Sequence, residues 1–221
     1  MATSGSRDFE LDVAEIIEEA YERCGIDVRT GYDAKTARRS LNLMFAEWAN
    51  RGLNLWTIVQ DTILLTQGQA QETLGPDVVD LLEVVVRRGG TDYEVEQISR
   101  GDYLTLPNKT TQGRVNQFYF DRTINPVINL WPTPDNSTDE LVFYYVRRIQ
   151  DADALVNTTD MPFRFYPCMV AGLAYYLAIK RAPERVQMLK MIYEEEFQRA
   201  ADEDEARTPL KLQPSIVYTR F

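Results

Sequence analysis

The chain has 221 residues, with 24 lysines and arginines against 34 aspartates and glutamates, which gives a net charge of −10 without any histidine. Hydrophobic residues make up 44% of the sequence, as in an average globular protein, but they never form the run of about 18 that a membrane-spanning helix requires. The absence of histidine excludes Ser-His and Cys-His nucleophile pairs and zinc sites built on histidine.

The N-terminal segment, residues 1–52, has the apolar periodicity of two helices. The stripe of the first helix consists of Phe9, Val13, Ile16, Ile17, Ala20 and Tyr21. Gly25 supplies the left-handed residue that commonly follows a helix, and Asp33 is the expected N-cap of the second helix. The stripe of that second helix consists of Ala34, Ala37, Leu41, Met44, Phe45 and Trp48. The segment is therefore predicted to form a helical hairpin.

The middle segment, residues 53–161, changes to the pattern of short strands separated by turns. Strands are expected at residues 55–66, 78–88, 93–98, 115–122, 127–131 and 140–148, with one helical turn at 99–106. The Gly89-Gly90 pair favours a tight hairpin between the second and third of these strands. The segment has 8 basic and 16 acidic residues, a net charge of −8, so most of the negative charge lies here.

The C-terminal segment, residues 162–207, returns to helical periodicity. Asp160, two residues before Pro162, is the expected start signal, and Pro167 and Pro183 suit the first turns of two helices. The apolar face of the first helix consists of Phe163, Tyr166, Met169, Val170, Leu173, Ala174 and Leu177. That of the second consists of Val186, Leu189, Tyr193, Phe197 and Ala200.

The last residues, 208–221, are predicted to form an extended docking tail. Pro209 and Pro214 disfavour a helix, yet the segment is apolar for a chain end. Its candidate docking side chains are Leu210, Leu212, Ile216, Val217, Tyr218 and Phe221. Together these patterns predict an α+β fold, in which the N- and C-terminal helices pack as an antiparallel helical bundle. Residues 53–161 are expected as an inserted antiparallel β-sheet region that forms a sandwich or a barrel-like sheet.

The sequence contains no phosphate loop, dinucleotide-binding fingerprint, nucleophile elbow or EF-hand, so no catalytic, cofactor-binding or metal site is predicted. Runs of carboxylates are interpreted as solvated faces, and an enzyme is not expected. Cys24 and Cys168 fit no metal or redox spacing, and the first residues lack the apolar core of a secretory signal. The cysteine spacing favours a reducing compartment.

The candidate subunit-interface residues are two arginine doublets and one tyrosine doublet. The tyrosines of Tyr144-Tyr145 are expected on opposite sides of a strand, so that one ring packs on the sheet and the other meets a neighbour. The doublets Arg38-Arg39 and Arg147-Arg148 are expected to form ion pairs within or between subunits rather than phosphate contacts.

Three blocks of the sequence resemble bacteriophage head-to-tail adaptors, a family that is also described as tail accessory factors or tail tubular proteins. The blocks are residues 13–26, 37–56 and 165–178. The second carries Leu41-Asn42, Trp48, Arg51-Gly52-Leu53 and Leu55-Trp56, similar to the family's passage from helical hairpin to first strand. The resemblance covers most of the chain and includes its α–β–α order.

The resemblance implies a structural virion protein at the neck of a phage particle. In this family the adaptor forms a ring beneath the portal, typically of twelve subunits, that extends the DNA channel and gives the tail a platform. The implied partners are the portal protein, a tail or nozzle protein and further copies of the chain, with no membrane. DNA is expected to pass without specific binding, and a wall of like charge suits that passage.

Two other functions remain open from the sequence alone. One is a different virion structural protein, such as a tail-completion or minor capsid protein. The other, less favoured, is a carboxylate-based cell-wall hydrolase carried by the virion. The tail also has two possible destinations, because it can anchor the protein to the portal or pack against the chain's own helices.

Overall fold

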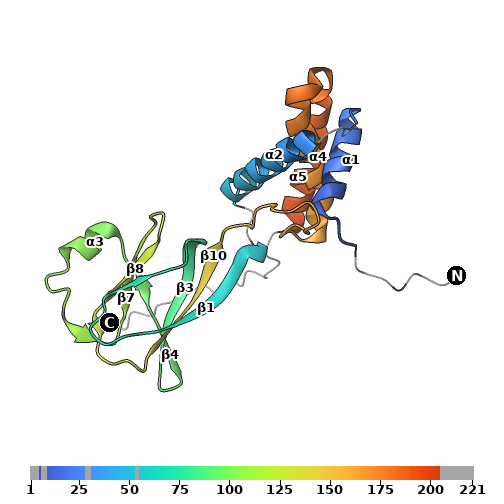
Figure 1. Ribbon diagram of the computed structural model, residues 1–221. Coiled ribbons are helices and arrows are strands. Elements are labelled where there is room, and N and C mark those ends of the chain that lie inside the picture. The colour runs from blue at the N-terminus through green and yellow to red at the C-terminus, as the bar shows by residue number, and fades with distance from the viewer. Residues whose placement is uncertain (1–4, 6–8, 28–30, 53–54, 205–221) are drawn as a thin grey trace, which may run out of the picture.

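The computed structural model describes residues 5, 9–27, 31–52 and 55–204 and folds them into helical and sheet parts at opposite ends of the molecule (Figure 1). Its α-helices are α1 (Val13–Cys24), α2 (Gly31–Asn50), α3 (Arg100–Thr105), α4 (Tyr166–Arg181) and α5 (Val186–Glu203). Short 3-10 turns precede β1, α4 and α5, at Leu55–Thr57, Phe163–Phe165 and Pro183–Arg185. The predicted α+β class is confirmed.

The ends of α1 follow from its local sequence. Asp12 and Glu15 form a capping box, in which Asp12 Oδ1 accepts from the Glu15 amide at 2.8 Å and Glu15 Oε2 accepts from the Asp12 amide at 3.1 Å. Gly25 ends the helix with a φ of 69°, a left-handed conformation that glycine adopts without steric cost. Phe9 lies before the helix and is exposed, so its inclusion in the buried stripe was wrong.

The prediction that Asp33 caps α2 is wrong, because the helix already begins at Gly31. Asp33 lies in the first turn and is buried, and its Oδ1 accepts a hydrogen bond of 2.6 Å from Arg181 at the end of α4. The side chain therefore joins two helices that are far apart in the sequence. The local pattern gave no sign of this long-range ion pair.

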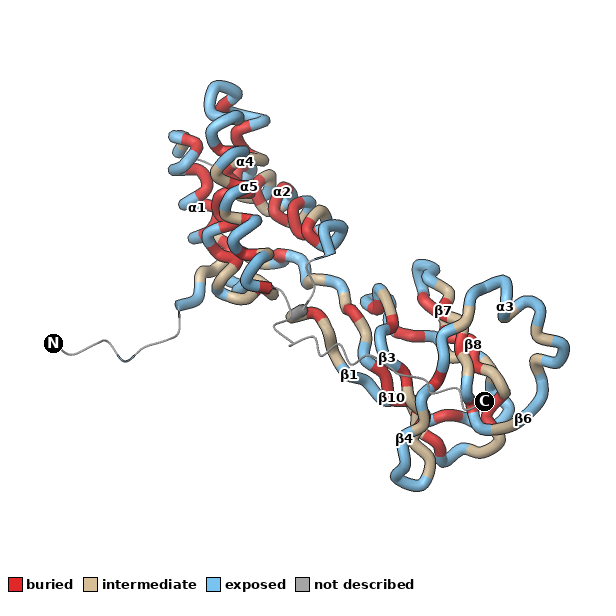
Figure 2. The backbone as a smooth tube through the Cα atoms, turned by 180° about the vertical axis from the view of Figure 1, so that it is seen from behind, coloured by how far each residue is buried: buried red, intermediate tan, exposed pale blue. Residues whose placement is uncertain are grey.

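Helices α1, α2, α4 and α5 bury one common apolar core, which Figure 2 shows as the red segments of the helical part. The Phe9 and Tyr166 rings lie 6.3 Å apart at one end, and Cys24 Sγ donates to the Ala174 carbonyl further along. These contacts place α1 and α4 side by side and parallel, so the expected antiparallel packing does not hold for this pair. The long excursion through the sheets permits the parallel arrangement, since a short loop would reverse the chain.

The β region contains β1 (Ile58–Leu64), β2 (Gln71–Thr73), β3 (Val78–Arg88), β4 (Thr91–Glu94), β5 (Glu96–Gln97), β6 (Gln112–Gly113), β7 (Gln117–Asp121), β8 (Val127–Trp131), β9 (Thr133–Pro134) and β10 (Glu140–Arg147). One sheet has the order β1-β10-β3-β4 and is antiparallel throughout. The other has the order β2-β8-β7-β5, where only β5 and β7 pair in parallel. The short strands β6 and β9 form a separate parallel pair.

Side chains from both four-stranded sheets meet in a second apolar core, so the β region is a small sandwich, as the sequence predicted in outline. The hairpin through Gly89-Gly90 and the helical turn α3 are also as predicted. The first strand begins at Ile58 and not at Leu55, because the chain leaves the helices through a 3-10 turn.

The segment that returns from the sheets packs on the helical part. Ala152 and Met161 belong to the helical core, and the Asn42 side chain of α2 accepts from the Ala152 amide at 2.8 Å. The amide of Val13 donates to the Asn157 carbonyl at 3.0 Å. The start of α1 and the end of the β excursion therefore hold each other in place.

Candidate functional site

The predicted interface residues of β10 lie where the sandwich meets the helical part. Tyr144 and Tyr145 occupy opposite faces of the strand, with Tyr144 43% exposed and the Tyr145 ring 5.8 Å from the buried Phe143. Arg148 is exposed just beyond the strand, and its amide donates to the Asp77 carbonyl at 2.8 Å. Tyr144 and Arg148 are thus available to a neighbouring molecule.

Arg147 instead completes an ion pair within the chain. Both of its terminal guanidinium nitrogens donate to the two carboxylate oxygens of Asp160, one of them at 2.8 Å. The same carboxylate accepts from the Gln150 amide at 3.1 Å, and the Asp160 carbonyl accepts from Trp56 Nε1 at 3.0 Å. The expectation that Asp160 starts a helix is wrong. Asp160 instead joins the end of β10 to Trp56, on the connection that leaves the helices, and to Gln150, on the connection that returns to them.

Replacing Asp160 by asparagine should destabilise this junction at neutral pH, by about 1–3 kcal/mol, because a largely buried guanidinium loses its charged partner. Burial raises the pKa of Asp160, but hydrogen bonds from Arg147 and Gln150 and the Arg147 charge outweigh it, so the net shift is downward. Because its pKa is lower in the folded state, ionised Asp160 stabilises the fold at pH values above its ordinary pKa of 3.8. This stabilisation is lost as the pH falls through the folded-state pKa.

The free energies of unfolding of wild type and Asp160→Asn should therefore converge as the pH is lowered below 3.8. Denaturant titrations at several pH values measure this. The exposed pair Arg87–Asp92 supplies the control, since Asp92→Asn should change stability little at any pH. A difference that stays constant down to the acid transition would contradict the role of the Asp160 charge.

Arg38 and Arg39 belong to a basic face on α2 that also includes Lys35 and, from α4, Lys180. Arg38 donates to the Asp153 carbonyl, whereas Arg39 is exposed. Lys180 donates to Ser40 Oγ at 2.6 Å, and its pKa is lowered by burial first and then by the charges of Arg39 and Arg181. The cationic side chains of this face repel one another, so a negatively charged partner would relieve that repulsion. The face is therefore suited to an acidic partner.

A further surface, absent from the predictions, is an apolar groove of about 600 Å³ between α1 and α4. Its apolar lining consists of Phe9, Leu11, Phe163, Tyr166, Pro167 and Val170. The charged side chains along it are Glu15, Glu18, Glu19, Glu22 and Arg23. Phe163 and Phe9 were assigned to buried helical stripes from the sequence, but both lie just before the helices, α4 and α1. Their exposed fractions are 74% and 68%.

The predicted tail residues lie outside the described part of the chain: Leu210, Leu212, Ile216, Val217, Tyr218 and Phe221. Within the described part, no group of three or more acidic residues and cysteines is placed to hold a metal ion. Every helix there is too short or too polar to cross a membrane. Both cysteines are buried, and burial raises the pKa of each thiol.

The surfaces described above are suited to contacts between proteins, and comparison with known proteins agrees with that class. The family model of the SU10 adaptor protein matches residues 11–213. Because this match covers most of the sequence, the chain belongs to the SU10 adaptor protein family, and the predicted resemblance to phage head-to-tail adaptors is confirmed. The protein is a structural adaptor of a bacteriophage. No curated protein matches the chain.

Proposed function

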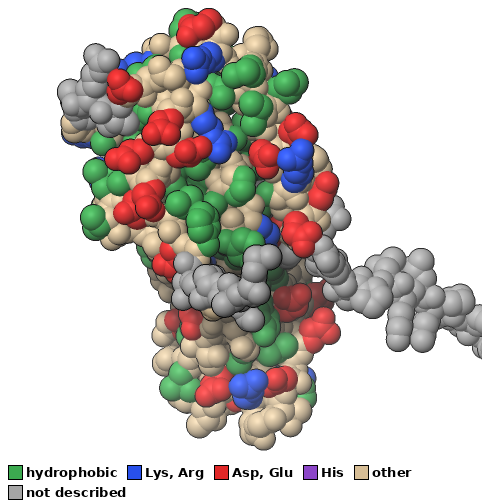
Figure 3. Space-filling model, turned by 90° about the vertical axis from the view of Figure 1, so that its right-hand side faces the viewer, with side chains coloured by type: hydrophobic (Ala, Val, Ile, Leu, Met, Phe, Trp, Pro, Cys, Tyr) green, Lys and Arg blue, Asp and Glu red, His purple; other side chains and the backbone are tan. Residues whose placement is uncertain are grey.

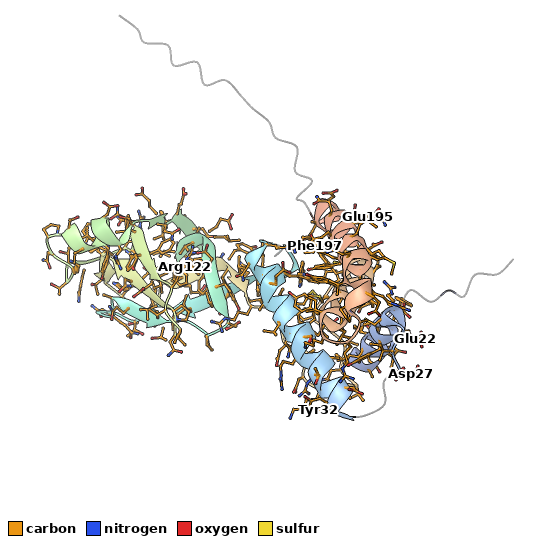
Figure 4. The ribbon with its side chains drawn as sticks, turned by 90° about the horizontal axis from the view of Figure 1, so that it is seen from above. Glu22, Asp27, Tyr32, Arg122, Glu195 and Phe197 are labelled. Atoms are coloured by element: carbon orange, nitrogen blue, oxygen red, sulfur yellow. The ribbon has the colours of Figure 1, made fainter. Side chains whose placement is uncertain are left out.

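We propose that this adaptor assembles as a closed ring beneath the portal, where it extends the DNA channel and offers a platform to the tail. The observation that carries the proposal is the family match over residues 11–213. The separation of the chain into a helical and a sheet part supports it, since one part can meet the portal and the other the tail. Figure 4 illustrates this separation, with Arg122 of the sheet part and Glu22 of α1 far apart.

The ring is proposed to be cyclic with about twelve subunits, as the family resemblance implies. Arg38, Arg39, Tyr144 and Arg148 are proposed to contribute to contacts between subunits. Tyr144, Arg39 and Arg148 are exposed, and tyrosine and arginine are both enriched at protein interfaces. Arg147 and Tyr145 contact Asp160 and Phe143 of their own chain. They are therefore proposed to hold β10 in position and not to touch the neighbouring subunit.

The basic face of α2 and the acidic β region suggest how neighbouring subunits attract each other. Residues 53–161 carry a net charge of −8, while Lys35, Arg38 and Arg39 lie together on α2. A lateral contact that brings the basic face of one subunit to the β region of the next reduces repulsion in both. The partners proposed beyond the ring are the portal protein and a tail or nozzle protein, in the neck of the virion.

Duplex DNA should not bind measurably to the protein at physiological salt. A ring of twelve subunits carries about −96 from the β regions alone, and like charge repels DNA phosphates over distances of about a Debye length. A gel-shift titration with short duplex DNA, run on the free protein and on its assembled form, measures this. Submicromolar binding that weakens as salt rises would contradict the proposal that DNA passes through the ring without adhering.

A further inference from the structure

The groove between α1 and α4 combines an apolar floor with unpaired negative charge. Phe163 and Phe9 extend from it into solvent, and Tyr166, Pro167 and Val170 form part of its lining. Figure 3 shows acidic side chains beside apolar surface on this half of the molecule. A surface of this kind favours an occupant that brings both apolar side chains and cations.

Two of the carboxylates along the groove have no cation of their own. Glu15 belongs to the capping box and Glu19 pairs with Arg23 at 2.9 Å. Glu18 and Glu22 are exposed, lie one helical turn apart, and form no ion pair with any described residue. Like charges four residues apart on a helix repel each other, so a cation placed between them relieves an unfavourable interaction.

The described chain ends beside this groove. Asp204, directly after α5, is buried and forms an ion pair with Arg164, the neighbour of Phe163 in the groove. Nε of Arg164 is also buried, without a hydrogen-bond partner in the described part of the chain. The chain therefore continues beyond Asp204 from a point next to the end of the groove that contains Phe163.

The continuing segment, residues 206–221, has the matching chemistry. It holds three cations, Arg207, Lys211 and Arg220, without a single carboxylate side chain, and six large apolar residues. Extended at about 3.3 Å per residue, it is longer than α1, which rises only about 1.5 Å per residue over 12 residues. Pro209 and Pro214 favour such an extended course.

We propose that, before assembly, residues 206–221 fold back into the groove between α1 and α4 of the same chain. Leu210 and Leu212 occupy the apolar floor, and Lys211 lies between the carboxylates of Glu18 and Glu22. Because the chain leaves α5 at the groove, the intramolecular contact has a high effective concentration and is favoured over capture of another copy's tail. The free subunit thus keeps its apolar segment covered until a partner displaces it. This inference concerns the isolated protein and does not rest on the proposed ring.

Trypsin cleavage after Lys211 in the full-length protein, followed by mass spectrometry at low protease concentration, tests the proposal. The reference is a synthetic peptide of residues 206–221, which gives the cleavage rate of the unbound segment. We expect wild type to be cleaved about tenfold more slowly than the peptide, because cleavage then tracks the small population of undocked tail. Equal rates in protein and peptide would overturn the proposal.

Two groove variants and two matched controls identify the site. Glu18→Gln combined with Glu22→Gln, and separately Phe163→Ser, should bring cleavage close to the peptide rate. All three side chains are exposed, so the fold should tolerate these changes. The controls, Glu83→Gln with Glu94→Gln and separately Ile124→Ser, alter exposed residues of the β region and should leave protection unchanged. Protection that persists in both groove variants would show that the tail docks elsewhere.

A dilution series separates docking within one chain from exchange between copies. Protection should be the same over a hundredfold range of protein concentration. Protection that falls on dilution, in step with the mass of the species in solution, would overturn the intramolecular contact and assign the groove to the tail of a second copy. The portal is absent from all these measurements, so their failure leaves the proposed ring untouched.

Discussion

Removal of residues 208–221 should abolish stable attachment of the adaptor to its portal while leaving the helical and sheet parts folded. The deleted segment lies outside the described residues and carries six large apolar side chains. Docked on a partner, each contributes about 1.5–3 kcal/mol, whereas ordering the backbone costs about 1–2 kcal/mol per residue. The net contribution per subunit is modest, but a ring repeats it, so that avidity makes the loss large.

Co-sedimentation of adaptor and cognate portal measures attachment, and circular dichroism with thermal melting confirms that the truncated protein is folded. A full-length variant with Leu210, Leu212, Ile216, Val217, Tyr218 and Phe221 replaced by serine is the matched control for length and charge. It should fail as the deletion does, since the apolar side chains carry the contact. Assembly of the truncated protein on the portal like that of wild type would move the attachment surface to the helices.

Replacing Trp48 by alanine should destabilise the helical part by about 3–5 kcal/mol, which lowers its melting temperature by about 6–20 °C. Trp48 is fully buried on α2, and its ring lies 5.7 Å from Phe165 and 5.9 Å from Phe197. Its Nε1 donates to the Tyr193 hydroxyl at 2.7 Å, and that hydroxyl donates to Glu47 at 3.0 Å. One side chain thus contacts α5 and the 3-10 turn that precedes α4.

Loss of the Trp48 indole leaves a cavity, and it also leaves the Tyr193 hydroxyl without the hydrogen bond that the indole donates. Burial raises the pKa of Tyr193, so the hydroxyl stays protonated and cannot compensate by ionising. The helix signal in circular dichroism follows the transition, and Trp131→Ala in β8 is the matched control. Trp131 is partly exposed, and its substitution should leave the helical transition nearly unchanged. If the melting temperature of Trp48→Ala fell as little as that of Trp131→Ala, the helical core would not depend on the indole.

The helices approach so closely at Gly172 that the core has little room for added atoms. Gly172 of α4 leaves room for two neighbours, since an added Cβ would lie 2.4 Å from Met44 Sδ and 2.8 Å from a ring carbon of Tyr193. Contacts under 3 Å require one of these buried side chains to shift. The same tight packing fixes the position of Tyr193 against Trp48.

Local sequence patterns predicted the elements well wherever the determinant lies within one or two helical turns. Gly25 ends α1 because a left-handed residue is needed there, and Trp48 is buried because it continues an apolar stripe. Asp33 and Asp160 were assigned as helix start signals for the same kind of reason, yet both are held by arginines elsewhere in the chain. An acidic residue near a helix start fits a cap and a tertiary ion pair equally, and only the fold decides between them.

The groove could not be predicted, because it exists only where α1 and α4 lie parallel. The two helices are separated by about 140 residues of sequence, and nothing in either stripe specifies their relative direction. Phe163 matched the helical period of the segment that follows, but the helix proper begins at Tyr166, so its side chain remains outside the core. Periodicity identifies a buried face and does not identify where the helix begins.

The most direct test of the proposed ring is a mass measurement combined with negative-stain imaging of the adaptor with and without its cognate portal. We predict that portal particles bind about twelve copies, which appear as a closed ring on one face and coaxial with the portal channel. Without the portal, the free protein should be of lower mass. A single bound copy per portal particle, or density attached off the channel axis, would contradict the ring.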